Sequence, residues 1–352
     1  MQVTLRSVDP VEWINSLQVL QASNLLFQSI PWHQVLEKAY NFKIDRYIAV
    51  DEHGELLGAI ASSPVALPSE YKHISLPFSD YAGPIGINSH SAQATFEAWL
   101  QKIGNDPAIV RLCGESFPSE NNGTIIRQGY VHRIDLKQNE ESLRKNLSKG
   151  FRAAIAQAER LNVEVRFDQS VDAFMRFWDI HSRLRREKFG EIPQPRRFFT
   201  LIAEEFALKG YGGVVEAWYG GTCIAGIVYL IVGNRVFYKF SASLLDRLDL
   251  RPNNLLMWRS MLKFRVDGLH QYDLGLTGAS NAYAGLRQYK LGTGADELPL
   301  RFVGFNQSAT SSASLESWKN FIGSLTKTIA ENVNIDTQSL DSLAEIIYPM
   351  LL

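Results

Sequence analysis

The sequence has only two cysteines, and neither lies in a reactive or metal-binding pattern. Cys113 and Cys223 lie inside the apolar runs AIVRLCG and GTCIAGIVYL, without the neighbouring ligands of a metal site or a redox pair. The seven histidines are isolated, with no pair at the helical spacing of zinc ligands, and no serine lies in a nucleophile elbow. Both cysteines are therefore predicted to be packing residues, and no metal site is predicted.

Long uncharged hydrophobic runs are also missing. No stretch reaches the roughly eighteen apolar residues that a membrane helix needs, and the first residues, MQVTLRSVDPVEW, have neither a basic start nor an apolar signal run. We therefore expect a cytoplasmic protein with no membrane span. At 352 residues, of which 45% are hydrophobic, the chain is long enough for two domains with substantial cores.

Charge of either sign is nearly balanced overall but not locally. The formal net charge is −1, yet residues 142–197 contain thirteen Lys and Arg against seven Asp and Glu. Such a region attracts anions, although the solvated face of an amphipathic helix explains any single member equally well. The cluster RLRREK, Arg183 to Lys188, leads into the loop FGEIPQP, where ligand-facing residues tend to lie.

Two parts of the chain repeat the same order of elements. Residues 47–65 and 214–232 each predict two strands joined by a glycine-containing turn. Each hairpin is followed by a helix that leads into a strand, over residues 92–112 and 255–275. The repetition predicts a duplicated α/β unit.

Helices are predicted between the two units and after them. Residues 139–161 read as one helical segment with an apolar face, formed by Leu143, Leu147, Phe151 and Ala154. Lys145, Lys149 and Arg152 project toward its other side. Residues 311–352 predict two more amphipathic helices, packed against the body of the protein.

A lone lysine stands out in YAGLRQYKLGTGA, residues 283–295. Lys290 has aromatic and aliphatic neighbours and precedes a glycine-rich turn, whereas in a phosphate-binding Walker motif the lysine follows the glycines. A lysine that reaches solvent across an aromatic cluster is one interpretation; a lysine in a site is the other. Asp273, alone in the predicted strand YDLGLTG, is likewise either a buried structural acceptor or a site residue.

Several segments, in their order, resemble one family. They are NLSKGFRAAIAQAERLNVEV, FWDIHSRLRREKFGEIP, FYKFSASLLDRLDLRPNNLLMW and the Lys290 segment, with FQSIPWHQVL and SLPFSDYAGPI in the first half. Over roughly residues 25–305 the chain is similar to the FemAB-related acyltransferases, which are tandem members of the GNAT superfamily. Some of these enzymes build peptidoglycan cross-bridges by moving amino acids from charged tRNA. The resemblance implies an α/β (α+β) fold of two GNAT-like domains with mixed sheets, over residues 1–140 and 141–310, followed by C-terminal helices over residues 311–352.

The resemblance also implies roles for individual residues. Lys290, in QYKLG, would stabilise the oxyanion of acyl transfer to an amine, and Arg186, with Arg183, would bind acceptor phosphates. Tyr238 and Lys239 point to opposite faces of a strand, and we choose Tyr238 as the residue in the cleft. The other implied substrate-binding residues are Asp273, Trp32, Asp80, Tyr81, Lys149 and Arg152. Ordinary packing is the alternative for Trp32, Asp80 and Tyr81.

Two departures from the family bear on the substrates. Where an acetyl-CoA enzyme has small residues in its pyrophosphate loop, residues 251–256 read RPNNLL, and Asn254 and Leu256 disfavour CoA without excluding it. Ala82 replaces the arginine that precedes Gly-Pro in cross-bridge enzymes, which argues against a peptidoglycan precursor as the acceptor. The predicted donor is aminoacyl-tRNA or acyl-CoA, with no tightly bound cofactor.

The predicted function is therefore N-acyl or aminoacyl transfer to an amine on a cell-envelope or polysaccharide precursor. Two other functions stay open. The duplicated scaffold could be a non-catalytic binder of a glycan or a nucleotide-sugar, and the basic segment suggests a nucleic-acid binder. Because the sequence has no RNA-recognition motif, any tRNA contact is expected to serve the transfer.

Overall fold

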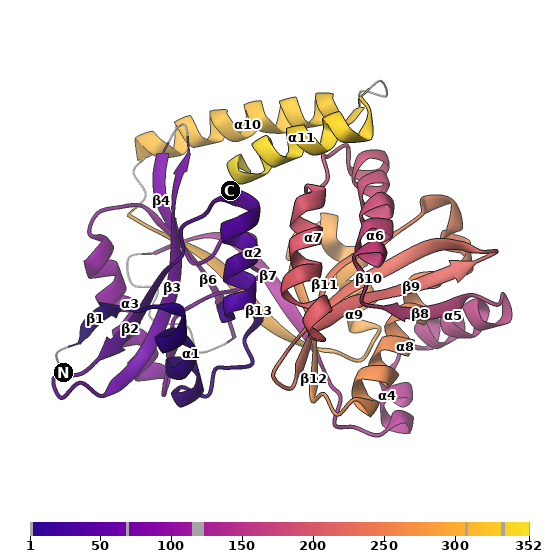
Figure 1. The fold of residues 1–352 in the computed structure, drawn as a ribbon, viewed down its shortest axis with the longest axis horizontal. Helices are drawn as coiled ribbons and strands as arrows, with labels where there is room; N and C mark the ends of the chain where they lie inside the picture. Colours follow the sequence, from indigo (N-terminus) through magenta and orange to yellow (C-terminus); the bar gives the residue numbers. More distant parts are fainter. Residues whose placement is uncertain (1–2, 68–69, 115–122, 307–308, 332–334, 352) are drawn as a thin grey trace.

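The fold is built on one continuous mixed sheet. The computed structural model describes residues 3–67, 70–114, 123–306, 309–331 and 335–351. Within these residues thirteen strands form a sheet in the order β1-β2-β3-β4-β6-β13-β7-β12-β11-β10-β9-β8, with β5 beside β3. The neighbouring pairs are antiparallel except β4 with β6 and β11 with β12, which are parallel. Figure 1 shows one half of the molecule on each side of β13 and β7. The predicted α/β (α+β) class is confirmed.

The first half contributes one end of this sheet and three helices. Its strands are β1 (Thr4–Ser7), β2 (Asp45–Val50), β3 (Leu56–Leu67), β4 (Glu70–Ile74), β5 (Ile85–Gly86), β6 (Ala108–Cys113) and β7 (Thr124–Asp135). Its helices are α1 (Pro10–Val19), α2 (Ile30–Tyr40) and α3 (Ser89–Ile103).

The second half repeats the pattern. Its strands are β8 (Glu164–Asp168), β9 (Gly212–Tyr219), β10 (Thr222–Val232), β11 (Arg235–Ser243), β12 (Gln271–Gly278) and β13 (Asp296–Phe305). Its helices are α4 (Glu140–Asn146), α5 (Lys149–Arg160), α6 (Val171–Leu184), α7 (Arg196–Glu205), α8 (Pro252–Val266) and α9 (Ala284–Leu291). A π-helical turn, Arg185–Phe189, extends α6.

Both predicted hairpins are present. β2 and β3 pair around Gly54, and β9 and β10 pair around Gly221. Both glycines have a positive φ, 83° and 79°, a conformation that residues with a Cβ rarely adopt. The turn chemistry in the sequence therefore placed both hairpins correctly.

The strand β13 joins the two halves. It lies between β6 and β7 and is antiparallel to both, so the last of the described strands completes the sheet of the first half. β7 in turn pairs with β12 of the second half. The two units therefore share strands, and the boundary predicted at residue 140 divides the chain but not the sheet.

The single helix predicted over residues 139–161 is wrong. The structure has α4 and α5, separated at Leu147, whose ψ of 139° is extended. The Ser148 side chain accepts a hydrogen bond from the backbone N–H of Phe151 and starts a new helix, as serine favours at an N-cap. Ala154, predicted on the apolar face, is only half-buried, while Ile155 is buried.

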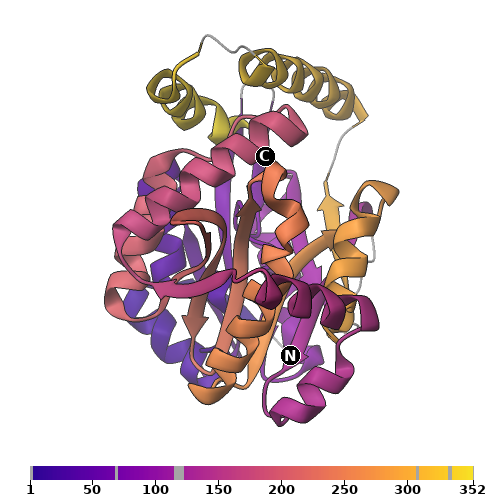
Figure 2. The same ribbon diagram turned by 90° about the vertical axis from the view of Figure 1, so that its right-hand side faces the viewer.

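The C-terminal helices α10 (Ala309–Glu331) and α11 (Thr337–Ile347) lie across both halves, as Figures 1 and 2 show. Asp341 accepts a hydrogen bond from the backbone N–H of Arg196 at 2.6 Å. Tyr348, just after α11, packs its ring against Tyr40 and Phe78 of the first half. None of the described helices is long and apolar enough to cross a membrane.

Candidate active site

The candidate site is built on an irregularity in β12. The register of β12 against β7 shifts between Asp273 and Leu276, and Gly275 within the shift has a φ of +69°. The Asp273 carboxylate accepts a hydrogen bond from the Gly275 N–H at 2.8 Å, which fixes the bulge. As a result, the carbonyl oxygens of Gly275 and Leu276 are free to meet a side chain from outside the strand.

That side chain is Lys290. Its ammonium donates to the Gly275 oxygen at 3.0 Å and to the Leu276 oxygen at 2.9 Å, from the last turn of α9. The residue is only 3% exposed. Burial lowers the pKa of Lys290 to about 8, against the opposing charges of Asp80 and Asp273. Lys290 is therefore a buried cation, and the interpretation that its ammonium reaches solvent is wrong.

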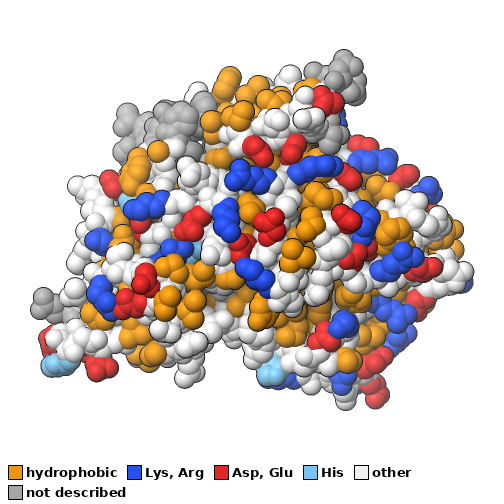
Figure 3. All heavy atoms as spheres, in the orientation of Figure 1, with side chains coloured by type: hydrophobic (Ala, Val, Ile, Leu, Met, Phe, Trp, Pro, Cys, Tyr) orange, Lys and Arg blue, Asp and Glu red, His pale blue; other side chains and the backbone are white. Residues whose placement is uncertain are grey.

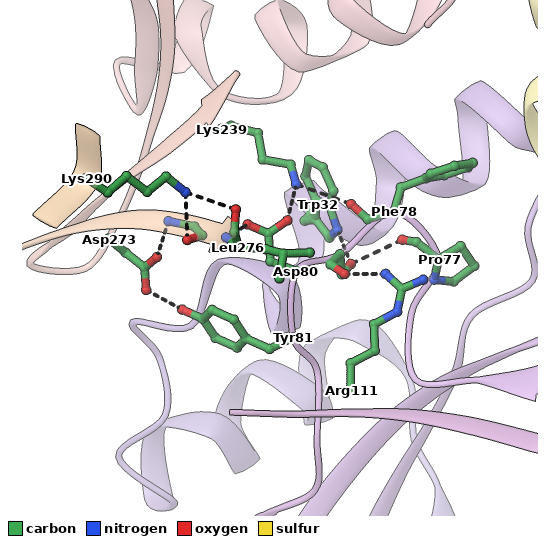
Figure 4. Close-up of polar contacts among 12 residues, drawn as sticks. Trp32, Pro77, Phe78, Asp80, Tyr81, Arg111, Lys239, Asp273, Leu276 and Lys290 are labelled. Carbon is green, nitrogen blue, oxygen red and sulfur yellow. Dashed lines mark hydrogen bonds and ion pairs between the residues drawn. The ribbon is translucent and has the colours of Figure 1, made fainter. Parts of the chain in front are cut away.

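Asp80 brings the first half to the same bulge (Figure 4). Its Oδ2 accepts from the Leu276 N–H at 3.2 Å, and its Oδ1 pairs with the Lys239 ammonium at 3.2 Å. Burial opposes ionisation of Asp80, but Lys239, the Leu276 N–H and Lys290 outweigh it and hold the pKa of the carboxyl below its usual range. Asp80 is therefore a charged partner shared by two lysines.

The backbone that carries Asp80 has an unusual conformation. Leu76 and Phe78 have φ values of +75° and +51°, in a region that residues other than glycine seldom occupy. Lys239 donates to the Phe78 oxygen at 3.2 Å, and Arg111 donates to the Ser79 oxygen. These two cations stabilise the turn, so its strained geometry is set by side chains from both halves.

Asp273 forms the second acidic centre. Its Oδ2 accepts from the Tyr81 hydroxyl at 2.7 Å and from Arg133 Nε at 3.0 Å. Burial, together with the charge of Asp273, raises the pKa of Tyr81 well above its usual value. The structure therefore brings together four of the predicted site residues, namely Lys290, Asp273, Asp80 and Tyr81.

Lys239 rather than Tyr238 is directed at the first half. Its ammonium lies 4.9 Å from the centre of the Trp32 ring and 4.8 Å from that of Phe27, and Trp32 donates its indole N–H to Ser79 at 2.8 Å. Tyr238 packs instead against the core of the second half. Tyr238 and Lys239 lie on opposite faces of β11, as predicted, but Lys239, rather than Tyr238 as chosen for the cleft, faces the first half and Asp80.

Arg183 and Arg186 lie elsewhere. They line a hollow of about 550 Å³. Its other described lining residues come from α6, the π-helical turn and α10, and none of them belongs to the Lys290 network. Arg183 is paired with Glu187 at 2.7 Å, and Arg186 donates to the Ala330 oxygen at 3.2 Å. The structure does not bring these two arginines to Lys290.

Five of the thirteen Lys and Arg in the basic segment pair with described carboxylates. The pairs are Arg166 with Glu164, Arg176 with Asp168 and Glu216, Arg183 with Glu187, Arg185 with Glu191, and Arg196 with Asp179. Figure 3 shows blue and red side chains interspersed on the right of the molecule rather than a single basic patch. The local excess of positive charge in the sequence therefore forms no uniform basic surface on this face.

A second hollow, of about 540 Å³, lies where the N-termini of α5 and α8 approach α9. We call it the α5–α8 hollow. Its described lining residues include Ser148, Gly150, Arg251, Asn254 and Gly292. Unpaired N–H groups at helix N-termini favour anions, and Lys149, exposed at the start of α5, adds positive charge beside it.

The two side chains predicted to crowd a phosphate, Asn254 and Leu256, do not both face this hollow. Leu256 is 0% exposed and packs into the core of the second half, so it does not crowd the hollow; Asn254 does line it. Arg152, predicted as a substrate residue, donates to the carbonyl oxygens of Arg144, Lys145 and Leu147. It therefore closes the C-terminal end of α4.

Comparison with known proteins identifies the second half. Residues 142–297 match the family model described as an acetyltransferase (GNAT) domain. This part of the chain is similar to a GNAT domain, and we refer to residues 142–297 below as the GNAT domain. A search of curated proteins by sequence found no match.

The resemblance extends beyond the GNAT domain at the level of fold. A crystal structure of FemX superposes with a TM-score of 0.64 at 11% identity, covering 85% of this chain and 96% of that one. The C-terminal domain of a lysylphosphatidylglycerol synthetase from Agrobacterium fabrum gives 0.56 at 12% identity, covering 88% and 96%. A tandem GNAT protein from the clavulanic acid pathway gives 0.54 at 8% identity, covering 88% and 100%. The predicted tandem GNAT fold is confirmed.

The GNAT domain supplies only part of the network. Lys290, Asp273 and Lys239 lie within residues 142–297, whereas Asp80 and Tyr81 come from the first half and Arg133 from β7. The sequence analysis missed Lys239 and Arg133. The sequence did contain a signal for both residues. Each is a cation in a strand whose other inward residues are apolar, and a buried charge needs a partner. Within the described residues, no group of three metal-ligand side chains is present.

Proposed function

We propose that this protein is an N-acyltransferase or aminoacyltransferase in which Lys290 stabilises the oxyanion. The observation that carries the proposal is the Lys290 ammonium, buried in a GNAT domain and held by two carbonyl oxygens of the β12 bulge. An ammonium has three N–H donors, and these bonds use two of them. Among the described residues, no hydrogen-bond acceptor meets the third, which is left for the reacting carbonyl.

The proposed step is direct transfer. The acceptor amine adds to the acyl carbonyl carbon, and the carbonyl oxygen gains the negative charge that Lys290 stabilises. Collapse of this intermediate breaks the C–S bond of a thioester or the C–O bond of an aminoacyl ester. The amine proton passes to the leaving sulfur or oxygen, directly or through water. An amide and a free thiol or hydroxyl result.

The α5–α8 hollow is the proposed site of the donor phosphates. Two helix N-termini and Arg251 are present there, and both CoA and the end of a tRNA carry phosphate. Tyr289 and Gly292, on either side of Lys290 in the sequence, also line the hollow, so the same short helix separates the phosphates from the reacting carbonyl. The inward turn of Leu256 leaves acyl-CoA as well as aminoacyl-tRNA as a candidate.

The proposed acceptor is an amine on a cell-envelope or polysaccharide precursor. The likeness to FemX and to the lysylphosphatidylglycerol synthetase domain favours an aminoacyl group as the one transferred. Since Arg183 and Arg186 lie outside the Lys290 network, they are not part of this acceptor site. The proposed acceptor contacts are instead those on the first-half side of the network, Asp80 and Tyr81.

The test is an assay of amide formation with two variants of Lys290. Purified protein is incubated with acyl-CoA thioesters or radiolabelled aminoacyl-tRNAs and a panel of amine acceptors, and the amide product is measured by mass spectrometry or label transfer. We expect Lys290→Met to lower kcat by about 10²–10³-fold, as loss of one oxyanion donor does, while donor affinity stays within about threefold. Lys290→Arg keeps the charge but not the geometry, and should retain part of the activity.

Lys263→Met is the matched control, because Lys263 lies on the surface of α8 and pairs with Asp267. It should behave as the wild type. Full turnover in Lys290→Met would show that the oxyanion assignment is wrong. Donor binding without amide formation by the wild type, across the whole panel, would indicate a binding protein on a GNAT scaffold instead.

A further inference from the structure

A small pocket lies where the start of β11 meets the first half. Its volume is about 220 Å³. Apolar side chains such as Leu25, Phe27 and Leu112 form much of its wall, and the charged lining residues are Arg133 and Arg235. No aspartate or glutamate is among the described residues that line it. The pocket is therefore partly apolar and positively charged.

The guanidinium of Arg235 forms neither a hydrogen bond nor an ion pair with any residue that the structure describes. Burial and the nearby charge of Arg133 lower the pKa of Arg235, against the weaker opposing effects of Tyr81 and Asp273. Arg133 uses Nε for Asp273 and Nη2 for Cys113 Sγ, at 3.0 and 3.8 Å, and its Nη1 meets no described acceptor. Two guanidinium groups thus have donors to spare beside one pocket, an arrangement that an anion stabilises.

Gln28 adds a hydrogen-bond acceptor to a pocket whose charged groups are donors. It is 2% exposed, and its Nε2 donates to the Gly83 oxygen at 3.4 Å. The Gly83 carbonyl fixes which end of the amide is the nitrogen, so Oε1 is the free end. Oε1 is buried and meets no donor among the described residues, although buried acceptors are almost always paired. A ligand in this pocket therefore needs a hydrogen-bond donor as well as a negative charge.

We propose that this pocket binds a small hydroxycarboxylate, with the carboxylate on Arg235 and Arg133 and the hydroxyl donating to Gln28 Oε1. The volume has room for about seven water molecules at ~30 Å³ each, which is too small for a nucleotide or CoA. Asp273 already neutralises Arg133, so one positive charge is left to match a monovalent carboxylate. An amino acid would place its ammonium beside Gln28 with no carboxylate of the protein to pair it. Lys290 itself does not line this pocket, although Tyr81 and Arg133 line it and also bond Asp273 of the Lys290 network.

Binding is tested by calorimetry without any acyl donor, using lactate and glycerate against three relatives: propionate lacks the hydroxyl, lactamide lacks the charge, and alanine replaces the hydroxyl by ammonium. Inorganic phosphate is the fourth comparison. We expect lactate or glycerate to bind, propionate to bind about tenfold more weakly because Gln28 stays unpaired, and the other three to bind more weakly still.

Two variants locate the site. Arg235→Gln should weaken lactate binding by at least about tenfold, and because Arg235 has no described partner to lose, the variant should fold as the wild type does. Gln28→Met should make lactate bind no better than propionate. Arg160→Gln, at an exposed arginine of α5, is the matched control and should leave binding unchanged.

Three outcomes would overturn the proposal. One is the absence of binding by both hydroxy acids, and another is undiminished binding in Arg235→Gln. Tighter binding of alanine or phosphate would contradict the assigned ligand class. Because Lys290→Met should bind lactate like the wild type, a failure here and a failure of the proposed acyl transfer are measured separately.

Discussion

Asp80 and Lys290 bind the two polar groups of a single residue, Leu276. The Asp80 carboxylate accepts from its N–H at 3.2 Å, and the Lys290 ammonium donates to its carbonyl oxygen at 2.9 Å. Asp80 belongs to the first half and Lys290 to the GNAT domain. The β12 bulge is therefore held by side chains from both halves, so a change in either half reaches the proposed reacting centre.

The pH dependence of transfer should have an alkaline limb set by Lys290. The pKa of Lys290 is lowered to about 8, so the ammonium loses its proton, and with it the charge that stabilises the oxyanion, as pH rises through that value. We expect kcat to fall above about pH 8. In Lys290→Arg the charge persists because a guanidinium stays protonated, and the residual activity should lose this limb. If the activity of Lys290→Arg fell at the same alkaline pH as that of the wild type, the alkaline limb would have to arise from another group.

Replacing Asp80 by asparagine should move this limb to lower pH. The negative charge of Asp80 raises the pKa of Lys290 against the effect of burial, and asparagine keeps an acceptor for Leu276 without the charge. The pH–rate profiles of Asp80→Asn and the wild type are compared, with Asp246→Asn, an exposed aspartate, as the control. An unmoved limb in Asp80→Asn would mean that the two charges are not coupled.

Gly275→Ala should damage both stability and transfer. The glycine has a φ of +69°, and an added Cβ would lie 2.6 Å from Asp80 Oδ2, which Leu276 and Lys239 hold in place. We expect a loss of about 2–3 kcal/mol in the free energy of unfolding, measured by urea denaturation. Gly323→Ala, at a helical glycine of α10 with open space around it, should be neutral or slightly stabilising. Equal effects of the two substitutions would contradict the close approach at the bulge.

Acid should destabilise the fold through its buried histidines, of which His181 is a clear case. Burial lowers the pKa of His181 to about 4, against the hydrogen bond that its Nε2 makes to Gln194 Oε1, which raises the pKa. Between about pH 6.5 and 4 the unfolded state binds the proton that the folded state refuses, so stability is present above pH 6.5 and is lost as pH falls. His181→Gln should reduce the slope of unfolding free energy against pH in this window by up to about 1.4 kcal/mol per unit.

His53→Gln is the control for this experiment, because the His53 side chain is 78% exposed. Its stability should follow the wild-type pH dependence. If His181→Gln retained the full slope between pH 6.5 and 4, the acid sensitivity would have to arise from other groups. Denaturation curves at three pH values, for example 7, 6 and 5, are sufficient to separate the two results.

The local elements of this protein could be predicted from its sequence. The two hairpins, the helices that follow them and the turns at Gly54 and Gly221 depend on signals within about twenty residues, where alternation and turn chemistry decide the backbone. The predictions failed where neighbours in space decided. Leu147 broke the expected helix, and the packing of the two halves decided that Lys239 rather than Tyr238 faces Phe27 and Trp32 of the first half.

By itself, the sequence determined the repeat, the tandem GNAT resemblance and Lys290 as the lysine of interest. Only the tertiary structure decided that β13 lies between β6 and β7, that Asp80 and Tyr81 reach β12, and that Arg183 and Arg186 do not join Lys290. These pairings join residues far apart in the chain. A buried charge is stable only beside a partner, and which partner it meets is set by the packing of the whole sheet rather than by the residues next to it in sequence.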